Sequence, residues 1–417
     1  MLCLGAPCNI MNTKYCRELR NKVIFMVVKI KDGIYWSGSV DWEVREFHGY
    51  ETSKGSSYNS YLIVDEKNVL IDSAKHYMFE ELIGGIKTVI DPRDIDYIVA
   101  NHAEKDHSGC IDKIVKLSGA KVITNEKGKE HLELQFNTDD WEFVIADTGD
   151  EINIGKRTLK FIKTPMLHWP DNMVTYCIED KILFSNDAFG QHVATSERFD
   201  YELGNIEEIF EDAKEYFANI LLPYKMLIPN AVNTVNDLDI EYICPSHGII
   251  WKEEIEKILN KYLEWSSGEC KNKAVIAYDS MYDSTKKIAH AIGNGLLDNG
   301  VEVKIYNISG TPMNTIMREI LDAKYILIGS PTLNSNVYPP VAMFLAYLEG
   351  LKPDGKIAAA FGSYGWMEMA TEVIKKSFEK LNFKIIDDEC LKCKFVPKEE
   401  HIKKCHEFGK KLSKDIL

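Results

Sequence analysis

The chain has 417 residues, of which 45% are hydrophobic, 27% charged and 11% aromatic. This composition excludes a disordered or fibrous chain, and the length predicts two or three domains. The formal net charge of −14 and the lack of a long basic run argue against nucleic acid or a membrane surface as a partner. No apolar run approaches the roughly 18 residues that span a bilayer. The 10 cysteines show no disulfide framework, which favours a cytoplasmic location.

The first 25 residues differ in character from the rest of the chain. They contain three cysteines and lack an apolar stretch followed by a small-residue cleavage site, so a signal peptide is not expected. Met26 opens the first β-like run. We therefore expect residues 1–25 to form an N-terminal extension that is either poorly ordered or a mis-assigned start.

In the first half, β-rich runs are separated by Gly, Asp and Asn turns from about Lys29 to Thr148. Residues 58–73 have the alternation of a β-hairpin, with its turn before Asn68. The patterns further predict a strand over 96–102 and helices over 78–90, 110–119 and 255–267. We expect a first domain over residues 26–268.

The polar segment 266–273 is the best candidate for a linker, because the pattern changes after it to regular strand–helix alternation. Strands are predicted over 274–278, 301–308, 325–330 and 356–363, and helices over 285–300, 313–323, 341–350 and 368–381. Such alternation is typical of an α/β fold with a doubly wound parallel sheet. We expect this second domain over residues 272–417.

The strongest chemical signal is the motif His102-x-Glu104-x-Asp106-His107, which directly follows a predicted strand. Three more potential metal ligands follow strand-like segments, namely His168, Asp187 and His247. In open α/β sheets, ligands gather outside the carboxyl ends of the strands. Seven such residues at strand ends therefore predict a metal site.

The order of these residues resembles the metallo-β-lactamase superfamily, whose αββα sandwich binds two metals. The hydrolases of that superfamily carry His where this chain has Glu104. With Asp106 and Asp187 the site then holds three carboxylates and four imidazoles, a harder donor set that favours iron or manganese over zinc. The resemblance therefore points to a redox metal pair rather than a zinc hydrolase.

Three loops follow strands of the second half and resemble the cofactor loops of a flavodoxin. Hydroxyl groups and the N-terminus of a helix after the first strand suit a phosphate. Trp366 offers a flat apolar face for a flavin ring. The resemblance implies FMN, held by Ser280, Met281, Tyr282, Ser284, Thr285, Pro331, Thr332, Asn334, Asn336, Ser363, Tyr364, Gly365 and Trp366. Asp283 is unusual in a phosphate loop, and its carboxylate must point away from the phosphate.

A di-metal lactamase-like domain followed by a flavodoxin-like domain resembles the flavodiiron proteins, also called A-type flavoproteins. The resemblance implies one iron on His102, Glu104 and His168, a second on Asp106, His107 and His247, and Asp187 as the bridge. It also implies that His48, His192 and Tyr224 line the reaction pocket as hydrogen-bond donors.

The resemblance further implies an oxidase that reduces dioxygen to water with electrons from FMN. Two irons and one FMN together hold the four electrons that this reaction consumes. The short two-domain members in methanogens, which this chain resembles, oxidise reduced coenzyme F420. The resemblance also implies a head-to-tail homodimer, with dimers often paired into a homotetramer. Nitric oxide as acceptor, a rubredoxin-type donor, a zinc hydrolase and a simple electron carrier stay open as alternatives.

Overall fold

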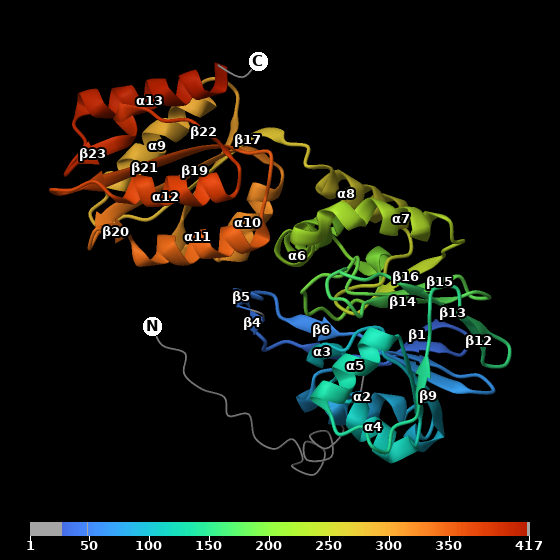
Figure 1. Ribbon diagram of the computed structural model, residues 1–417. Coiled ribbons are helices and arrows are strands. Elements are labelled where there is room, and N and C mark those ends of the chain that lie inside the picture. The colour runs from blue at the N-terminus through green and yellow to red at the C-terminus, as the bar shows by residue number, and fades with distance from the viewer. Residues whose placement is uncertain (1–26, 48, 415–417) are drawn as a thin grey trace, which may run out of the picture.

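The computed structural model describes residues 27–47 and 49–414. The expectation for residues 1–25 therefore lies outside the described residues. Two sheets form the N-terminal half and a third forms the C-terminal half, with helices on their outer faces (Figure 1). None of the helices in the described ranges combines the length and apolar character that a bilayer crossing requires.

The first sheet has the strand order β1-β2-β7-β8-β9-β10-β11. Its strands are β1 (Val28–Lys31), β2 (Ile34–Trp36), β7 (Tyr61–Ile63), β8 (Asn68–Ile71), β9 (Ile95–Val99), β10 (Lys121–Thr124) and β11 (Phe143–Ile145). The predicted hairpin is confirmed, because Tyr61 pairs with Ile71 across antiparallel β7 and β8. The outer face of the first sheet carries α2 (Phe79–Ile86), α4 (Ile111–Ser118) and α5 (Glu126–Gln135).

The second sheet has the order β12-β13-β14-β15-β16. Its strands are β12 (Glu151–Asn153), β13 (Thr158–Lys163), β14 (Met173–Cys177), β15 (Ile182–Asn186) and β16 (Tyr242–Pro245). Alternate residues of the two sheets, such as Ile71 and Phe184, are buried against each other between them. The opposite face is covered by α6 (Ile206–Tyr216), α7 (Ile228–Asn236) and α8 (Ile255–Ser267), which completes an αββα sandwich.

The third sheet has the order β18-β17-β19-β21-β22, and these strands are parallel. They are β17 (Lys271–Tyr278), β18 (Glu302–Asn307), β19 (Ala323–Leu333), β21 (Ile357–Tyr364) and β22 (Lys384–Ile385). One face is covered by α9 (Ser284–Leu297) and α13 (Glu399–Lys414), the other by α10 (Met313–Leu321), α11 (Pro339–Leu351) and α12 (Ala370–Lys380). The predicted doubly wound sheet is confirmed.

Short elements complete the fold around these sheets. The strands β3 (Ser39–Asp41) and β6 (Ser56–Tyr58) pair with each other, as do β4 (Glu46–Phe47) and β5 (Tyr50–Glu51). Two further strands, β20 (Asn336–Val337) and β23 (Lys392–Lys394), extend the third sheet, and α3 (Lys105–Ser108) follows β9.

The prediction of a linker over 266–273 was too long. Helix α8 ends at Ser267 and β17 begins at Lys271, so only residues 268–270 connect them. The polar character of this segment has a different cause, because Lys273 is buried in an ion pair with Asp322 at 2.9 Å. Paired charges allow a lysine to occupy a buried strand position.

The two halves pack directly on each other. One hydrophobic cluster continues from the outer face of the second sheet to the face of the third sheet under α10, α11 and α12. At its edge, Lys214 of α6 pairs with Asp322 at 2.8 Å, and the Tyr347 hydroxyl donates to Asn219 Oδ1 at 2.7 Å. Apolar packing together with these polar contacts fixes the orientation of the two halves.

Candidate metal centre and flavin cleft

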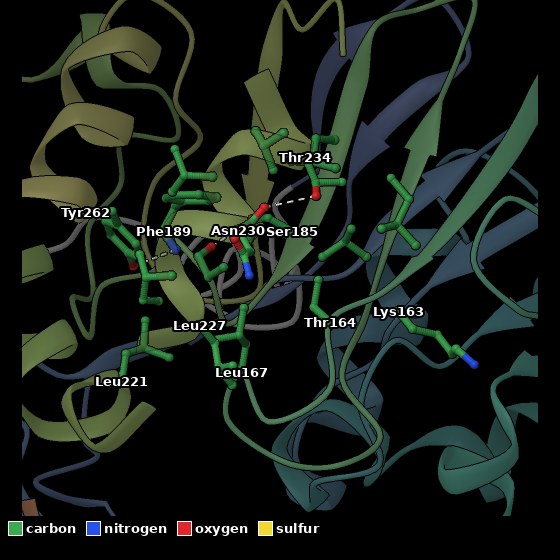
Figure 2. A pocket seen from close by; sticks show the side chains of 18 of the residues that line it. Lys163, Thr164, Leu167, Ser185, Phe189, Leu221, Leu227, Asn230, Thr234 and Tyr262 are labelled. Carbon is green, nitrogen blue, oxygen red and sulfur yellow. Dashed lines mark hydrogen bonds between the residues drawn. The ribbon is translucent and has the colours of Figure 1, made fainter. Parts of the chain in front are cut away.

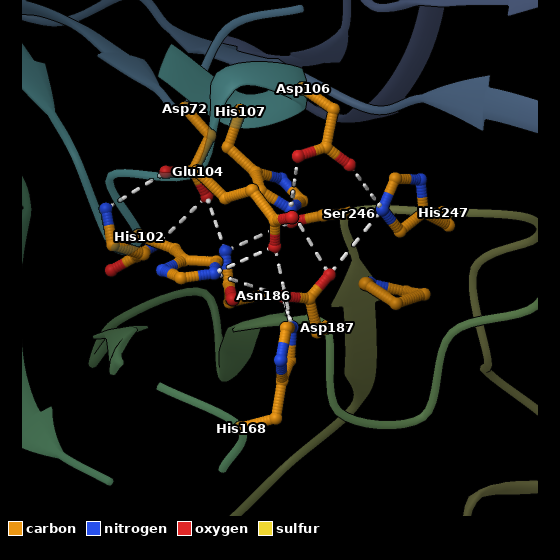
Figure 3. Close-up of polar contacts among 12 residues, drawn as sticks. Asp72, His102, Glu104, Asp106, His107, His168, Asn186, Asp187, Ser246 and His247 are labelled. Carbon is orange, nitrogen blue, oxygen red and sulfur yellow. Dashed lines mark hydrogen bonds and ion pairs between the residues drawn. The ribbon is translucent and has the colours of Figure 1, made fainter. Parts of the chain in front are cut away.

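Seven potential metal ligands converge at one end of the αββα sandwich (Figure 3). The loop after β9 and helix α3 carry four of them, and loops after β13, β15 and β16 carry His168, Asp187 and His247. The ligands come from strands of both sheets, β9 in the first and β13, β15 and β16 in the second, so residues far apart in the sequence meet at this end of the sandwich.

The ligand atoms form two groups, one of His102, Glu104, His168 and Asp187 and the other of Asp106, His107 and His247. Within each group the ligand atoms lie within 4.8 Å of one another. Asp187 faces both groups, since its Oδ2 lies 3.3 Å from His168 Nε2 and its Oδ1 lies 3.1 Å from His107 Nε2. Each oxygen of this carboxylate is thus placed to serve a different ion.

Asp106 and Glu104 complete the two groups from one loop. Asp106 Oδ2 lies 3.2 Å from His247 Nε2, while Glu104 Oε2 lies 3.2 Å from His102 Nε2 and 3.5 Å from His168 Nε2. The structure thus brings all seven expected residues together in these two groups, and their assignment to individual irons stays a prediction.

Electrostatics keep the bridging carboxylate charged. Burial alone would raise the pKa of Asp187, but His107, His168 and His247 hold that pKa well below its usual range. Burial likewise opposes the charged form of His247, yet Asp106 and Asp187 raise its pKa to about 10. Without metal, the ionised carboxylates keep a proton on such an imidazole, and a divalent cation that binds there would displace that proton.

Unsatisfied atoms indicate that the cluster suits metal ions. Asp106 Oδ1, His107 Nε2 and Asp187 Oδ2 are buried, and apart from ion-pair contacts among the ligands themselves they have no hydrogen-bond partner among the described residues. A buried polar atom without a partner costs about 1–3 kcal/mol, and metal coordination would offset that cost. The residues present therefore fit two divalent ions with mixed imidazole and carboxylate ligands.

Sequence reasoning missed a second layer behind the ligands. Asp171 Oδ2 accepts from His102 Nδ1 at 2.9 Å and from the Ala103 amide at 2.7 Å, and its Oδ1 lies 3.1 Å from His131 Nδ1. His247 Nδ1 instead lies 2.7 Å from the Ser57 carbonyl. Such outer partners fix the orientation of the imidazole ring of a metal ligand. A carboxylate partner also makes that imidazole a stronger electron-pair donor to the metal.

The three residues expected as pocket donors have different outcomes. His48 lies outside the described residues. His192 packs its ring 4.8 Å from that of His247, and its Nδ1 lies 2.9 Å from Ser56 Oγ. Tyr224, in the described chain, has no hydrogen bond, ion pair or ring contact with a ligand residue and packs on the hydrophobic core.

The tyrosine that reaches the site is Tyr216, at the end of α6. Its hydroxyl donates to Asp187 Oδ1 at 3.0 Å, and burial together with the nearby Asp187 charge raises its pKa well above the usual value. This hydroxyl therefore stays protonated and can act as a donor beside the bridging carboxylate.

The second site is a cleft of about 370 Å³ at the carboxyl ends of β17, β19 and β21. Of the residues expected to hold FMN, ten line it: Met281, Tyr282, Ser284, Pro331, Thr332, Asn334, Ser363, Tyr364, Gly365 and Trp366. Sequence reasoning missed Leu333, Ser335, Met367, Phe395 and Val396, which also line it. The Trp366 side chain is 89% exposed, so its face is free for a planar ring.

Three of the expected FMN residues do not line this cleft. Ser280 Oγ, at the start of the expected phosphate loop, is buried and has no hydrogen-bond partner within the described ranges. Thr285 Oγ1 lies 2.9 Å from Ser363 Oγ. Asn336 instead accepts from the amide of Val337 at 2.8 Å, within its own turn. Asp283 also lies outside the cleft lining and faces Lys286 at 3.9 Å, in agreement with the expected orientation of its carboxylate.

Both halves match known families. Residues 57–248 match the ODP family beta lactamase model, and residues 276–409 match the flavodoxin model. Over 391 residues the chain is 68% identical to a protein of Methanocaldococcus jannaschii, covering 94% of this chain and 99% of that one. It is 42% identical to the nitric oxide reductase of Moorella thermoacetica, covering 93% of this chain and 98% of that one.

Solved structures extend the likeness to the arrangement of both domains. The rubredoxin oxygen:oxidoreductase of Desulfovibrio gigas superposes with a TM-score of 0.90 at 36% identity, over 94% of this chain and 98% of that one. The flavodiiron protein of Giardia intestinalis also gives 0.90, at 37% identity, over 93% of this chain and 96% of that one. A flavin-binding domain joined to a di-metal domain defines an oxidoreductase. The chain belongs to the flavodiiron proteins, and its cofactors are FMN and two iron ions.

Proposed function

We propose that this flavodiiron oxidoreductase reduces dioxygen to water at its di-iron site, with electrons that pass through FMN from reduced coenzyme F420. The observation that carries the proposal is Asp187, whose two oxygens face the two ligand groups at 3.3 and 3.1 Å. A shared carboxylate holds two ions close enough to act on one small molecule. The similarity to an enzyme named oxygen:oxidoreductase supports oxygen as the acceptor.

When bound, FMN and the irons supply the electrons and the metal positions at which the gas is reduced. The chain itself supplies positioning and protons. Asp171 orients the His102 ring, and the backbone carbonyl of Ser57 orients His247. Tyr216 and His192 lie beside the ligands and can donate hydrogen bonds to the reacting oxygen atoms. Burial of six of the seven ligand residues limits the access of bulk water to the reaction.

The flavin cleft supports a donor that stacks on FMN. Tyr282 and Trp366 are 87% and 89% exposed at its rim, and Phe395 is 62% exposed. A deazaflavin that passes hydride must lie face to face with the flavin, and aromatic rims favour planar partners. The 68% identical relative comes from Methanocaldococcus jannaschii, which is consistent with a donor used by methanogens.

The test is to mix the holoenzyme with reduced coenzyme F420 under anaerobic conditions and then add dioxygen. We expect rapid oxidation on this addition, with one O2 consumed per two molecules of reduced F420. Faster turnover with nitric oxide would favour the reductase named among the relatives. Activity only with a reduced rubredoxin would show that rubredoxin, rather than coenzyme F420, is the electron donor. Two zinc ions per chain together with hydrolytic activity would overturn the proposed redox function.

We also propose that the working unit is a head-to-tail homodimer, paired into a tetramer. The cleft lies at the carboxyl ends of the third sheet, near β20, whereas α6 of the metal domain packs near α10 (Figure 1). Fast electron transfer needs close centres, and a two-fold dimer would bring Trp366 to the partner's metal centre. An Asp187→Ala chain mixed with a chain altered at Ser284 and Thr285 should recover activity. No recovery despite subunit exchange would assign electron transfer to a single chain.

A further inference from the structure

A pocket of about 230 Å³ lies beside the metal centre and has no role in the chemistry described above. It is enclosed by the outer face of β13, β14 and β15 and by α7 (Figure 2). Its rim contains the exposed residues Leu227, Asn230 and Thr234, while its floor is buried. The pocket therefore leads from the surface into the core of the metal domain.

The floor offers almost nothing to water. It is formed by apolar side chains that include Ile162, Val174, Leu183 and Val232. Three polar groups of the lining make hydrogen bonds within the protein. Ser185 Oγ donates to the Ala188 carbonyl at 2.8 Å, Thr234 Oγ1 donates to the Asn230 carbonyl at 3.0 Å, and Tyr262 Oη accepts from the Phe189 amide at 2.6 Å. Apolar cavities of about 150 Å³ stay dry and bind xenon, and this pocket has that character.

The deep end of the pocket touches the segments that carry two metal ligands. Leu167 lines it and directly precedes His168. Ala188 and Phe189 line it and directly follow Asp187. The pocket lining and the first ligand group therefore share two chain segments, each with a lining residue next in sequence to a ligand.

We propose that this pocket, here called the α7 pocket, binds uncharged diatomic gas and delivers it to the metal centre. The inference rests on the proposed function and adds the route of its substrate. Dioxygen and nitric oxide are small and weakly hydrated, so an apolar space concentrates them relative to water. The buried floor offers ions and polar solutes only apolar side chains, so it favours an uncharged gas over them.

Xenon is a direct probe, because it binds dry apolar cavities without needing chemistry. In crystals of the holoprotein under xenon pressure, we expect a xenon atom in the floor of the α7 pocket. Ala231→Phe, which places a ring in the pocket from α7, should abolish that site. Asn233→Phe adds the same ring to an exposed position of the same helix and should leave it intact. A wild-type crystal without xenon in this pocket would overturn the proposal.

Kinetics test whether the pocket serves the reaction. Ala231→Phe should raise the KM for dioxygen several-fold, with kcat at saturating gas, iron content and FMN content unchanged. Ala231→Leu fills less space and should give a smaller rise, which provides a second variant if the larger one folds poorly. A lost xenon site with an unchanged KM would overturn the delivery route. A holoenzyme that consumes neither gas would contradict the proposed function instead, and xenon would still decide whether the pocket binds gas.

Discussion

The metal centre and the flavin cleft both lie at the carboxyl ends of strands, yet they differ in how complete they are. Six of the seven metal ligands are buried and the seventh, His168, is half-buried. By contrast, Tyr282 and Trp366 at the flavin cleft are almost fully exposed. The protein thus encloses its metal ligands and leaves its flavin contacts open.

This difference reflects what each site must do. The metal centre needs a dry and rigid donor set, so buried carboxylates and imidazoles compensate one another's charge. The flavin cleft must admit a cofactor and then a donor, so its apolar surfaces stay at the outside. Exposed aromatic patches of this kind mark binding surfaces. Metal removal should accordingly disturb the interior of its domain, whereas flavin removal should disturb only a surface.

The largest effect is expected for Asp187→Ala. Because the two oxygens of Asp187 face both ligand groups, the variant should lose both irons, and activity should fall to background. FMN content should be unchanged, since the cleft lies in the other domain. Iron and FMN per chain are measured on the purified protein. Asp239→Ala removes an exposed carboxylate and serves as the control. Retention of one iron would show that Asp187 does not bridge.

A second test concerns the seam between the two regions. Asp322 accepts ion pairs from Lys214 and Lys273, at 2.8 and 2.9 Å. Asp322→Asn leaves these buried lysines with fewer partners and should lower the free energy of unfolding by about 3 kcal/mol at pH 7. Urea unfolding provides the measurement. Glu302→Gln breaks an exposed pair with Lys304 and should cost less than about 1 kcal/mol.

The contribution of Asp322 to the free energy of unfolding should also depend on pH. Burial raises the pKa of Asp322, but Lys214, Lys271 and Lys273 outweigh burial and lower that pKa below its value in the unfolded chain. The ionised carboxylate therefore stabilises the fold above the unfolded-state pKa of about 4, and this contribution is lost as the pH falls through the lower folded-state pKa. The difference between wild type and Asp322→Asn should shrink towards acid pH. A constant difference would contradict an ionic role.

The metal ligands could be predicted from sequence because each follows a strand. The rule that ligands gather at the carboxyl ends of strands therefore applies to all of them. Asp171 and Tyr216 could not be predicted, because their hydrogen-bond partners lie 69 and 29 residues away in the sequence. No local motif indicates these two hydrogen bonds. Tyr224 was expected in the pocket instead of Tyr216. A π-helix over Phe217–Leu221 and a 3-10 helix over Leu222–Leu227 follow α6, and Tyr224 in the latter packs on the hydrophobic core.

The flavin cleft shows the same limit. The loops after β17, β19 and β21 are rich in turn-forming and hydroxyl residues. These residues allowed the sequence to predict that the three loops line the cleft. Phe395 and Val396 could not, because they follow the short edge strand β23, which pairs with β21 about 30 residues earlier in the chain. Long-range strand pairing, rather than composition, places them beside Trp366.

A smaller effect is expected for the second layer of the metal centre. Asp171→Ala removes the acceptor of His102 Nδ1 and should weaken iron binding by about 10- to 100-fold. Asp171→Asn keeps an oxygen that can accept but removes the charge, so it should restore part of the affinity. Competition with a chelator measures both variants. The exposed carboxylate of Asp140 supplies a neutral control as Asp140→Asn. Equal affinity of all three variants would remove Asp171 from the metal centre.

The smallest effect is expected at the phosphate loop. The Thr285 hydroxyl is buried at the start of α9, 2.9 Å from Ser363 Oγ. Thr285→Val keeps the volume and removes the hydrogen bond that positions the cleft residue Ser363, so it should weaken FMN binding by about tenfold at most. Fluorescence titration of the FMN-free protein measures the affinity, and iron content is the internal control. Because the metal ligands lie in the other domain, a loss of iron together with FMN would show that the two sites are not independent, and the contrast between an enclosed and an open site would then fail.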